Sequence, residues 1–83
     1  MAKIYFTDHA KQQLKERHLN EKSVVAIITK PESTKKQADG RLKIIGTLTK
    51  KPKLFLLVII AEKTDHTLTI VTVFKTSKVK KYL

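Results

Sequence analysis

The sequence predicts an α+β domain in which two helices precede a sheet of four antiparallel strands. Apolar residues recur at helical spacing up to residue 29, and the period changes after Pro31 to the alternation typical of strands. Asp39-Gly40 is a strong hairpin signal, because both central positions of a type I′ turn need positive φ. With 83 residues the chain can build one small core, so we expect a single domain over residues 1–83.

The first helix is expected over residues 9–18. Thr7 or Asp8 can serve as its N-cap, since either side chain accepts a hydrogen bond from the free amides of the first turn. Ala10 and Leu14 form its apolar stripe. This stripe indicates a short helix that covers one face of the sheet.

The second helix is expected over residues 21–29. Asn20 is a suitable N-cap, and Pro31 ends the helix because proline disfavours helical geometry in the preceding residue. Before the first helix, residues 2–6 alternate weakly. They would form either a short extra strand or a hydrophobic lead-in.

The four strands follow the helices, at residues 32–38, 41–48, 54–62 and 67–75. The third of these is apolar on both faces, which indicates a central strand covered on each side, or covered on one side and packed on a partner on the other. In the fourth we expect Leu68, Ile70 and Phe74 to share one face with Thr72, and Thr69, Val71 and Val73 to share the other. Two short helices cover only one sheet face, so the other should meet a second copy of the chain or a docked helix of a partner. Residues 76–83 form either a final half-turn of helix or a loose arm.

The formal net charge is +11, and the cations are unevenly distributed. Residues 35–53 carry many lysines against Asp39 as the lone acid, and no acid follows Asp65. Such a charge favours a polyanionic partner, either nucleic acid or an acidic protein. The alternative is that the lysines serve solubility and block edge-to-edge aggregation.

Several classes of site are excluded. The chain has no cysteine, so disulfides and thiolate metal sites are absent and a reducing cytoplasm fits best. No His-x-x-x-His pair or acidic cluster supports a metal, and no cofactor is expected. Residues 1–11 lack an apolar signal-peptide segment, and the apolar run 54–61 is shorter than the about 20 residues that cross a bilayer as a helix. We therefore expect a cytoplasmic protein without a membrane partner.

One chemistry needs only cations and a proton carrier: metal-independent cleavage of RNA. His9 is the candidate proton carrier, because an unperturbed pKa near about 6.5 allows either role; alternatively it caps the helix or packs under the sheet edge. Arg17 follows the apolar stripe of the first helix, so its stem should lie against the sheet. Its guanidinium would then meet either an internal acid such as Glu21 or a ligand phosphate. Arg41, the only other arginine, begins a strand and is a candidate for bidentate phosphate binding.

A second group is expected to bind the RNA itself. Crowded lysines lower one another's pKa, and a tyrosine beside them could stack on a base; the alternative is a solvated tail without chemistry. The group consists of Lys43, Lys75, Lys78, Lys80, Lys81 and Tyr82.

The order of these motifs resembles a known family. The pattern is similar to that of the RelE/ParE-type toxin superfamily, in a small branch close to the BrnT toxins. The resemblance rests on the Thr-Asp-His-Ala opening of the first helix, the arginine at its end, the second helix closed by proline, the Asp-Gly-Arg hairpin and the Lys-rich end. One departure is Phe74, where the family usually has tyrosine. The resemblance implies two helices on a compact antiparallel sheet, ribonuclease activity in many members, and an antitoxin that wraps the toxin. It points to His9, Arg17, Arg41 and the tail 75–82.

These observations together predict the toxin of a bacterial toxin–antitoxin pair that acts as a metal-independent endoribonuclease. Arg17 and Arg41 would hold the scissile phosphate and His9 would move a proton, in a cationic pocket between the first helix and the sheet. The expected partners are RNA, free or on the ribosome, and a cognate acidic antitoxin. Two alternatives remain: a non-catalytic module that binds RNA or an acidic protein, and an orphan structural domain that dimerises through its sheet.

Overall fold

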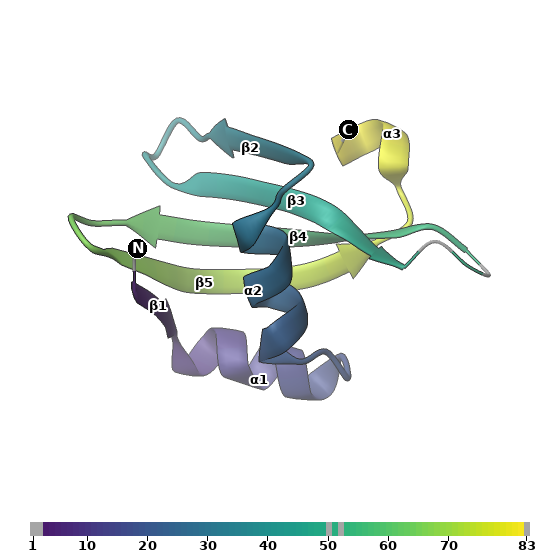
Figure 1. The fold of residues 1–83 in the computed structure, drawn as a ribbon, viewed down its shortest axis with the longest axis horizontal. Coiled ribbons are helices and arrows are strands. Elements are labelled where there is room, and N and C mark those ends of the chain that lie inside the picture. The colour runs from purple at the N-terminus through teal and green to yellow at the C-terminus, as the bar shows by residue number, and fades with distance from the viewer. Residues whose placement is uncertain (1–2, 50, 52, 83) are drawn as a thin grey trace.

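The computed structural model describes residues 3–49, 51 and 53–82 (Figure 1). Its elements are β1 (Lys3–Phe6), α1 (Asp8–Glu16), α2 (Glu21–Thr29), β2 (Ser33–Lys36), β3 (Leu42–Thr49), β4 (Phe55–Lys63), β5 (Thr67–Thr76) and α3 (Val79–Tyr82). The strands form one sheet in the order β1-β5-β4-β3-β2. The α+β class and the two N-terminal helices are confirmed. The four predicted strands correspond to β2–β5 and pair antiparallel. Of the two expectations for residues 2–6, the short extra strand is confirmed as β1; it runs parallel to β5, so the sheet is mixed and has five strands, and α3 adds a third helix.

The start of α1 is attached to β5 by two side chains. The hydroxyl of Thr7 accepts from the amide of Ala10 at 3.1 Å, as an N-cap does, and donates to the carbonyl of Ile70 at 3.0 Å. One and a half turns later, Gln13 Oε1 accepts from the amide of Val73 at 2.9 Å. These contacts hold α1 under β5, and they explain how the preceding residues of β1 reach the free edge of the same strand.

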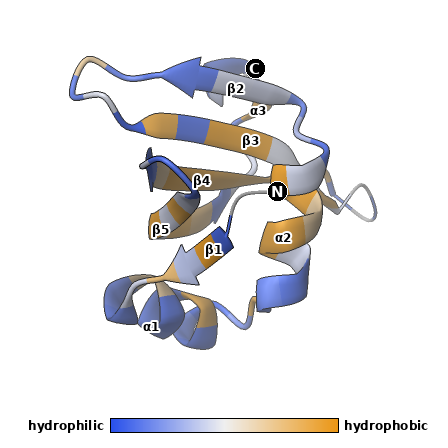
Figure 2. Ribbon diagram, turned by 60° about the vertical axis from the view of Figure 1, so that its left-hand side comes forward, coloured by the Kyte–Doolittle hydropathy of each residue, from blue (hydrophilic) through white to orange (hydrophobic). Residues whose placement is uncertain are grey.

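The main core lies between the sheet and the two N-terminal helices. Figure 2 shows apolar residues concentrated in β3, β4 and α2, whereas β2 and the outward surface of α1 are hydrophilic. The central strand β4 is buried on both faces, as predicted: Leu57 and Ile59 pack in the helix-side core, and Leu56 and Val58 pack on the opposite side. Among the described helices none is long and apolar enough to cross a membrane.

Close packing of α2 on β3 depends on one glycine. A Cβ atom at Gly46 would lie 2.5 Å from Cγ2 of Ile27, well inside contact distance. The second glycine serves the β2–β3 connection, where Gly40 has a φ of 89°. The predicted hairpin is therefore present. The prediction of a type I′ turn is wrong, however, because Asp39 keeps a negative φ. The backbone of Gln37 closes the loop instead, with hydrogen bonds to Gly40 and Arg41.

The face of the sheet turned away from α1 and α2 is called the outer face. By register it carries the residues Tyr5, Ser33, Lys35, Arg41, Lys43, Ile45, Thr47, Leu56, Val58, Ile60, Glu62, Thr69, Thr72, Phe74 and Thr76. The chain's own α3 covers part of this face, where Val79 and Tyr82 pack against a small buried cluster of Ile45, Leu56 and Val58. Of the two expectations for the chain end, the half-turn of helix is confirmed.

A β-bulge in β5 corrects one prediction about this face. Ile60 lies opposite Thr72 while Ala61 lies opposite Ile70, so Val71 is an extra residue in β5. The alternation shifts by one position after the bulge. As a result Val73 joins Leu68 and Ile70 in the helix-side core, and Phe74 moves to the outer face.

Candidate nucleic-acid interface

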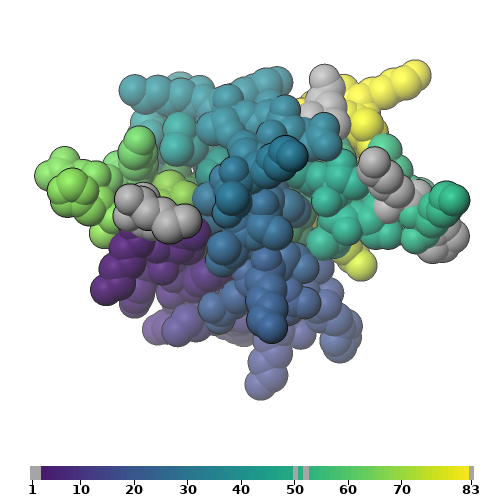
Figure 3. Space-filling model, viewed as in Figure 1, coloured from purple at the N-terminus to yellow at the C-terminus, as the bar shows by residue number. Residues whose placement is uncertain are grey.

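One end of the sheet carries lysines without acids on the same segments. No Asp or Glu occurs between Gly40 and Ala61 or after Asp65. The segments concerned meet where β3 ends, β4 begins and β5 leads into α3. In Figure 3 the chain end (yellow) and the residues flanking the β3–β4 connection (teal to green) protrude together at this end. We call it the basic end; its described cations are Lys51, Lys53, Lys75, Lys78, Lys80 and Lys81. Lys43, near the start of β3, joins them because its ammonium reaches Tyr82 of α3.

Tyr82 stands at the centre of the first group of contacts at the basic end. The ammonium groups of Lys43 and Lys81 each lie 5.5 Å from the centroid of its ring. Phe74 meets the same ring edge to face, with centroids 5.9 Å apart and an interplanar angle of 66°. Both aromatic rings are half-buried, so packing on the outer face holds them in place while part of each stays accessible. These four residues are called the Tyr82 cluster.

Phe55 forms a second aromatic group at the same end. The ammonium of Lys75 lies 5.2 Å from its ring centroid, and that of Lys53 lies 5.8 Å away. The alternation of β4 places Phe55 on the helix side of the sheet, opposite to its neighbour Leu56. Each contact is worth about 0.5–1 kcal/mol at an exposed site. The basic end therefore presents lysines and aromatic rings on both sides of the sheet.

One carboxylate reaches the outer face from outside the lysine-rich segments. Glu32 precedes β2, and its Oε1 accepts from the hydroxyl of Thr47 at 3.2 Å. Thr47 lies opposite Leu56 on the outer face, with Thr76 on the other side of Leu56. The carboxylate is thus held at the β2 side of the sheet, by a hydroxyl and not by a lysine.

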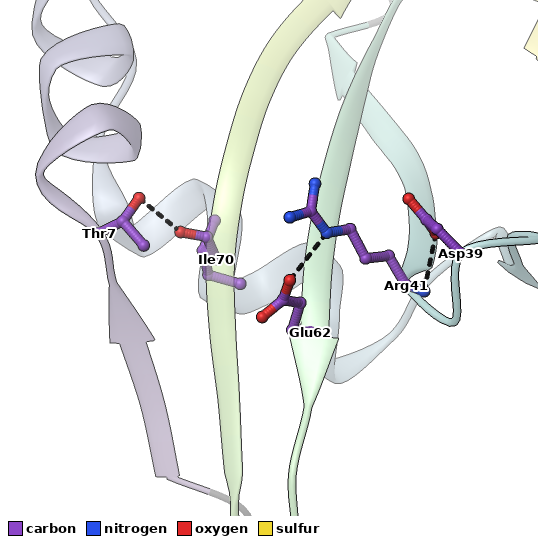
Figure 4. A network of polar contacts seen from close by, with 5 residues as sticks. All are labelled: Thr7, Asp39, Arg41, Glu62 and Ile70. Carbon is purple, nitrogen blue, oxygen red and sulfur yellow. Dashed lines mark hydrogen bonds and ion pairs between the residues drawn. The ribbon is translucent and has the colours of Figure 1, made fainter.

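The three predicted catalytic residues are not brought together. His9 lies in the first turn of α1 and Arg17 is the C-cap of that helix, about 12 Å away along the axis. Arg41 belongs to the outer face, whereas α1 packs on the helix side. Its Nε donates to Glu62 Oε1 at 2.8 Å, and its amide donates to Asp39 Oδ1 at 3.0 Å (Figure 4).

The predicted cationic pocket between α1 and the sheet is absent from the described part of the chain. That space holds apolar side chains, Ala10 and Leu14 among them, and no described polar or charged residue is buried there. The prediction that the stem of Arg17 lies against the sheet is wrong, since this residue is exposed. Arg17 keeps the helical phase, since its amide donates to the carbonyl of Gln13 at 3.0 Å, but it is the C-cap beyond the last residue of α1, and its side chain is exposed there.

The predicted RNA-binding residues are better grouped. Lys43 lies far from the chain end in sequence, yet the structure places it with Lys81 on the ring of Tyr82. Lys75 joins the Phe55 group, while Lys78 and Lys80 are exposed before and within α3. Sequence reasoning missed Phe55, Lys53 and Phe74 as members. The Lys-x-Phe spacing of Lys53 and Phe55 could have indicated their contact. The position of Phe74 depends on the bulge in β5, which no local sequence pattern reveals. Among the described residues no cluster of three His, Asp or Glu side chains exists that could hold a metal.

Comparison with known proteins gives one match. Residues 6–75 match the family model described as Domain of unknown function (DUF4258). The matched range contains Lys43, Phe55 and Phe74 and stops before α3. Neither the curated proteins nor the solved structures contain a match to this chain.

Proposed function

The chain belongs to the DUF4258 family, and we propose that it binds single-stranded RNA at its basic end without cleaving it. The observation that carries this proposal is the Tyr82 cluster, in which two lysines separated widely in sequence meet one half-exposed aromatic ring. In single-stranded RNA complexes, cations bind the phosphates and aromatic side chains stack on the unpaired bases. The Tyr82 cluster holds two ammonium groups, each 5.5 Å from the centroid of an aromatic ring.

A single strand suits the basic end better than a duplex does. The Tyr82 ring could reach the face of a base only where that base is unpaired, because a duplex exposes groove edges and not base faces. Two hydroxyl groups near the cluster favour RNA over DNA. The hydroxyl of Thr47 donates to Glu32, so its oxygen can still accept a hydrogen bond from a ribose 2′-hydroxyl. The hydroxyl of Thr76 accepts from the amide of Lys78, so its proton can still be donated to a ribose 2′-hydroxyl.

Catalysis is not supported by the positions of the candidate residues. A general acid or base must lie within about 2.6–3.2 Å of the proton it moves, directly or through one water. A phosphate bound at Lys43 and Lys81 would lie on the outer face, whereas His9 lies on a helix beneath the other face. The toxin and endoribonuclease functions suggested by the family resemblance stay predictions.

The binding test uses fluorescence anisotropy with a 5′-labelled oligouridine at several salt concentrations. Tyr82→Ala should weaken binding about tenfold, as expected for the loss of one stacked base. The Lys43→Gln/Lys81→Gln variant should also lower the salt slope, by about 0.7 for each phosphate that is no longer neutralised. Lys15→Gln/Lys22→Gln removes two exposed lysines from α1 and α2 and is the matched control.

Two results would contradict the proposal. The first is equal weakening in the control and in the cluster variant, which would mean that net charge alone attracts the RNA. The second is cleavage of the oligonucleotide by the wild-type protein in EDTA that His9→Ala abolishes. That result would restore the nuclease predicted from the sequence.

A further inference from the structure

A tyrosine stands exposed at the other end of the outer face. Tyr5 is 55% exposed, on the edge strand β1. Its neighbours Ile4 and Phe6 pack in the helix-side core, and its register partner is Thr69. The ring of Tyr5 therefore belongs to the same face as the Tyr82 cluster. An isolated exposed aromatic is ordinary, so its surroundings decide whether it has a function.

An arginine just before β3, separated from Tyr5 by β5 and β4, is held in position by a carboxylate. Thr69 pairs with Tyr5 on one side and with Glu62 on the other, and Glu62 Oε1 accepts from Nε of Arg41 at 2.8 Å. This contact engages one of the five N–H groups of the guanidinium. Figure 4 shows both terminal nitrogens of Arg41 on the side away from Glu62. Glu62 thus orients the guanidinium and leaves its terminal donors for a bidentate contact with phosphate.

The surface between this arginine and the Tyr82 cluster is continuous. Lys43, Ile60 and Thr72 form one row across the outer face, and all three are half-buried. From Thr69 to Phe74 the strand advances about 13 Å, once the bulge residue is discounted. A few nucleotides of an extended single strand cover this distance. Lys43 lies at both the row and the Tyr82 cluster, so cations line the path from that cluster to Arg41.

We propose that Tyr5 is a second base-stacking site, and that one RNA strand crosses the outer face from the Tyr82 cluster to Tyr5 with a phosphate held by Arg41. This inference rests on the proposed function. Charge complementarity favours nucleic acid as the occupant, because the two described carboxylates at this face are already engaged, Glu62 by Arg41 and Glu32 by the hydroxyl of Thr47. The inference fixes a minimum length for the ligand and the path that it follows over the sheet.

The two sites can be observed separately, since the chain has two tyrosines and no tryptophan. In Tyr82→Phe, which keeps a ring at the first site, emission comes from Tyr5 alone; in Tyr5→Phe it comes from Tyr82. An oligouridine of about six nucleotides should quench both variants, and one of about two nucleotides should quench only Tyr5→Phe. The longer oligonucleotide should bind at least tenfold tighter than the shorter one.

Substitution provides the second arm of the test. Tyr5→Ala should lower the affinity for the longer oligonucleotide about tenfold, leave the shorter one unchanged, and leave the salt slope unchanged because no charge is removed. Arg41→Gln should weaken the binding of the longer oligonucleotide and lower the salt slope of that binding by about 0.7. Val25→Ala, an exposed apolar residue of α2, is the control and should change neither.

The outcomes separate this inference from the proposed function. If Tyr82→Ala weakens binding but Tyr5→Ala has no effect at either length, the second site is overturned and the first stands. If no oligonucleotide binds the wild-type protein, both are overturned. If Tyr5→Ala instead converts a dimer of the free protein into a monomer in sedimentation velocity, a second copy of the chain occupies this face and the inference is overturned.

Discussion

Replacing Thr7 with alanine tests how α1 is attached to the sheet. The variant loses the N-cap bond to Ala10, worth about 1 kcal/mol, and the bond donated to the carbonyl of Ile70, worth about 0.5–1.5 kcal/mol. The carbonyl of Ile70 keeps the hydrogen bond from the Thr7 amide at 3.2 Å, so it is not left without a partner. We therefore expect a loss of about 1.5–2.5 kcal/mol in the free energy of unfolding.

Urea denaturation followed by circular dichroism measures this loss, and a thermal melt should show a decrease of roughly 10 °C for a domain of this size. Thr7→Ser keeps both hydroxyl bonds and should remain within about 1 kcal/mol of the wild type. Thr7→Asp separates the two contributions, because a carboxylate accepts from Ala10 but cannot donate to Ile70. Equal stability of the alanine and serine variants would refute the reasoning, since the hydroxyl would then contribute nothing.

Three further substitutions should change stability in directions that the structure specifies, each measured by urea denaturation. Gly46→Ala should lower the free energy of unfolding by about 1–3 kcal/mol, because its Cβ would meet Ile27. Adding Ile27→Ala to this variant should relieve part of the clash. If Gly46→Ala has no effect on stability, α2 can move aside. His18→Gly should stabilise by about 0.5–1 kcal/mol, because glycine adopts the φ of 55° without strain; a decrease in stability would show that the histidine makes a compensating contact. Gln13→Leu should destabilise by about 1–3 kcal/mol by leaving the amide of Val73 without its acceptor, whereas Gln13→Glu keeps an acceptor and should cost less.

The placement of Arg41 changes the role that can be expected of it. The sequence suggested that the two arginines act together on one phosphate. In the structure Arg17 is exposed at the end of α1, and Arg41 is oriented by Glu62 on the outer face. Phosphate binding by Arg41 therefore stays a prediction, now as the proposed anchor for a bound strand and apart from Arg17 and His9.

Local signals in the sequence were sufficient for the helices, the β2–β3 hairpin and the central strand. Asn20 does cap α2, since its Oδ1 accepts from the amide of Ser23 at 2.8 Å, and Thr7 caps α1. A cap, a turn residue or an unbroken apolar run acts within a few residues of itself, so its physical effect is written in the adjacent sequence. The same holds for the charge, because the lysine-rich segments follow directly from the order of the residues.

The proposed binding surface depends on contacts between distant segments. The bulge at Val71 turns Phe74 to the outer face, and an alternating pattern cannot reveal an extra residue because a shift by one reverses every later side chain. The pairing of β3 with β4 and β5 brings Lys43 to Tyr82, and the parallel addition of β1 brings Tyr5 to the same face. By itself the sequence determined which residues are cationic, aromatic or helical. Only the packing of the sheet decided which of them share a face, because strand order and register are set by long-range burial and hydrogen bonding.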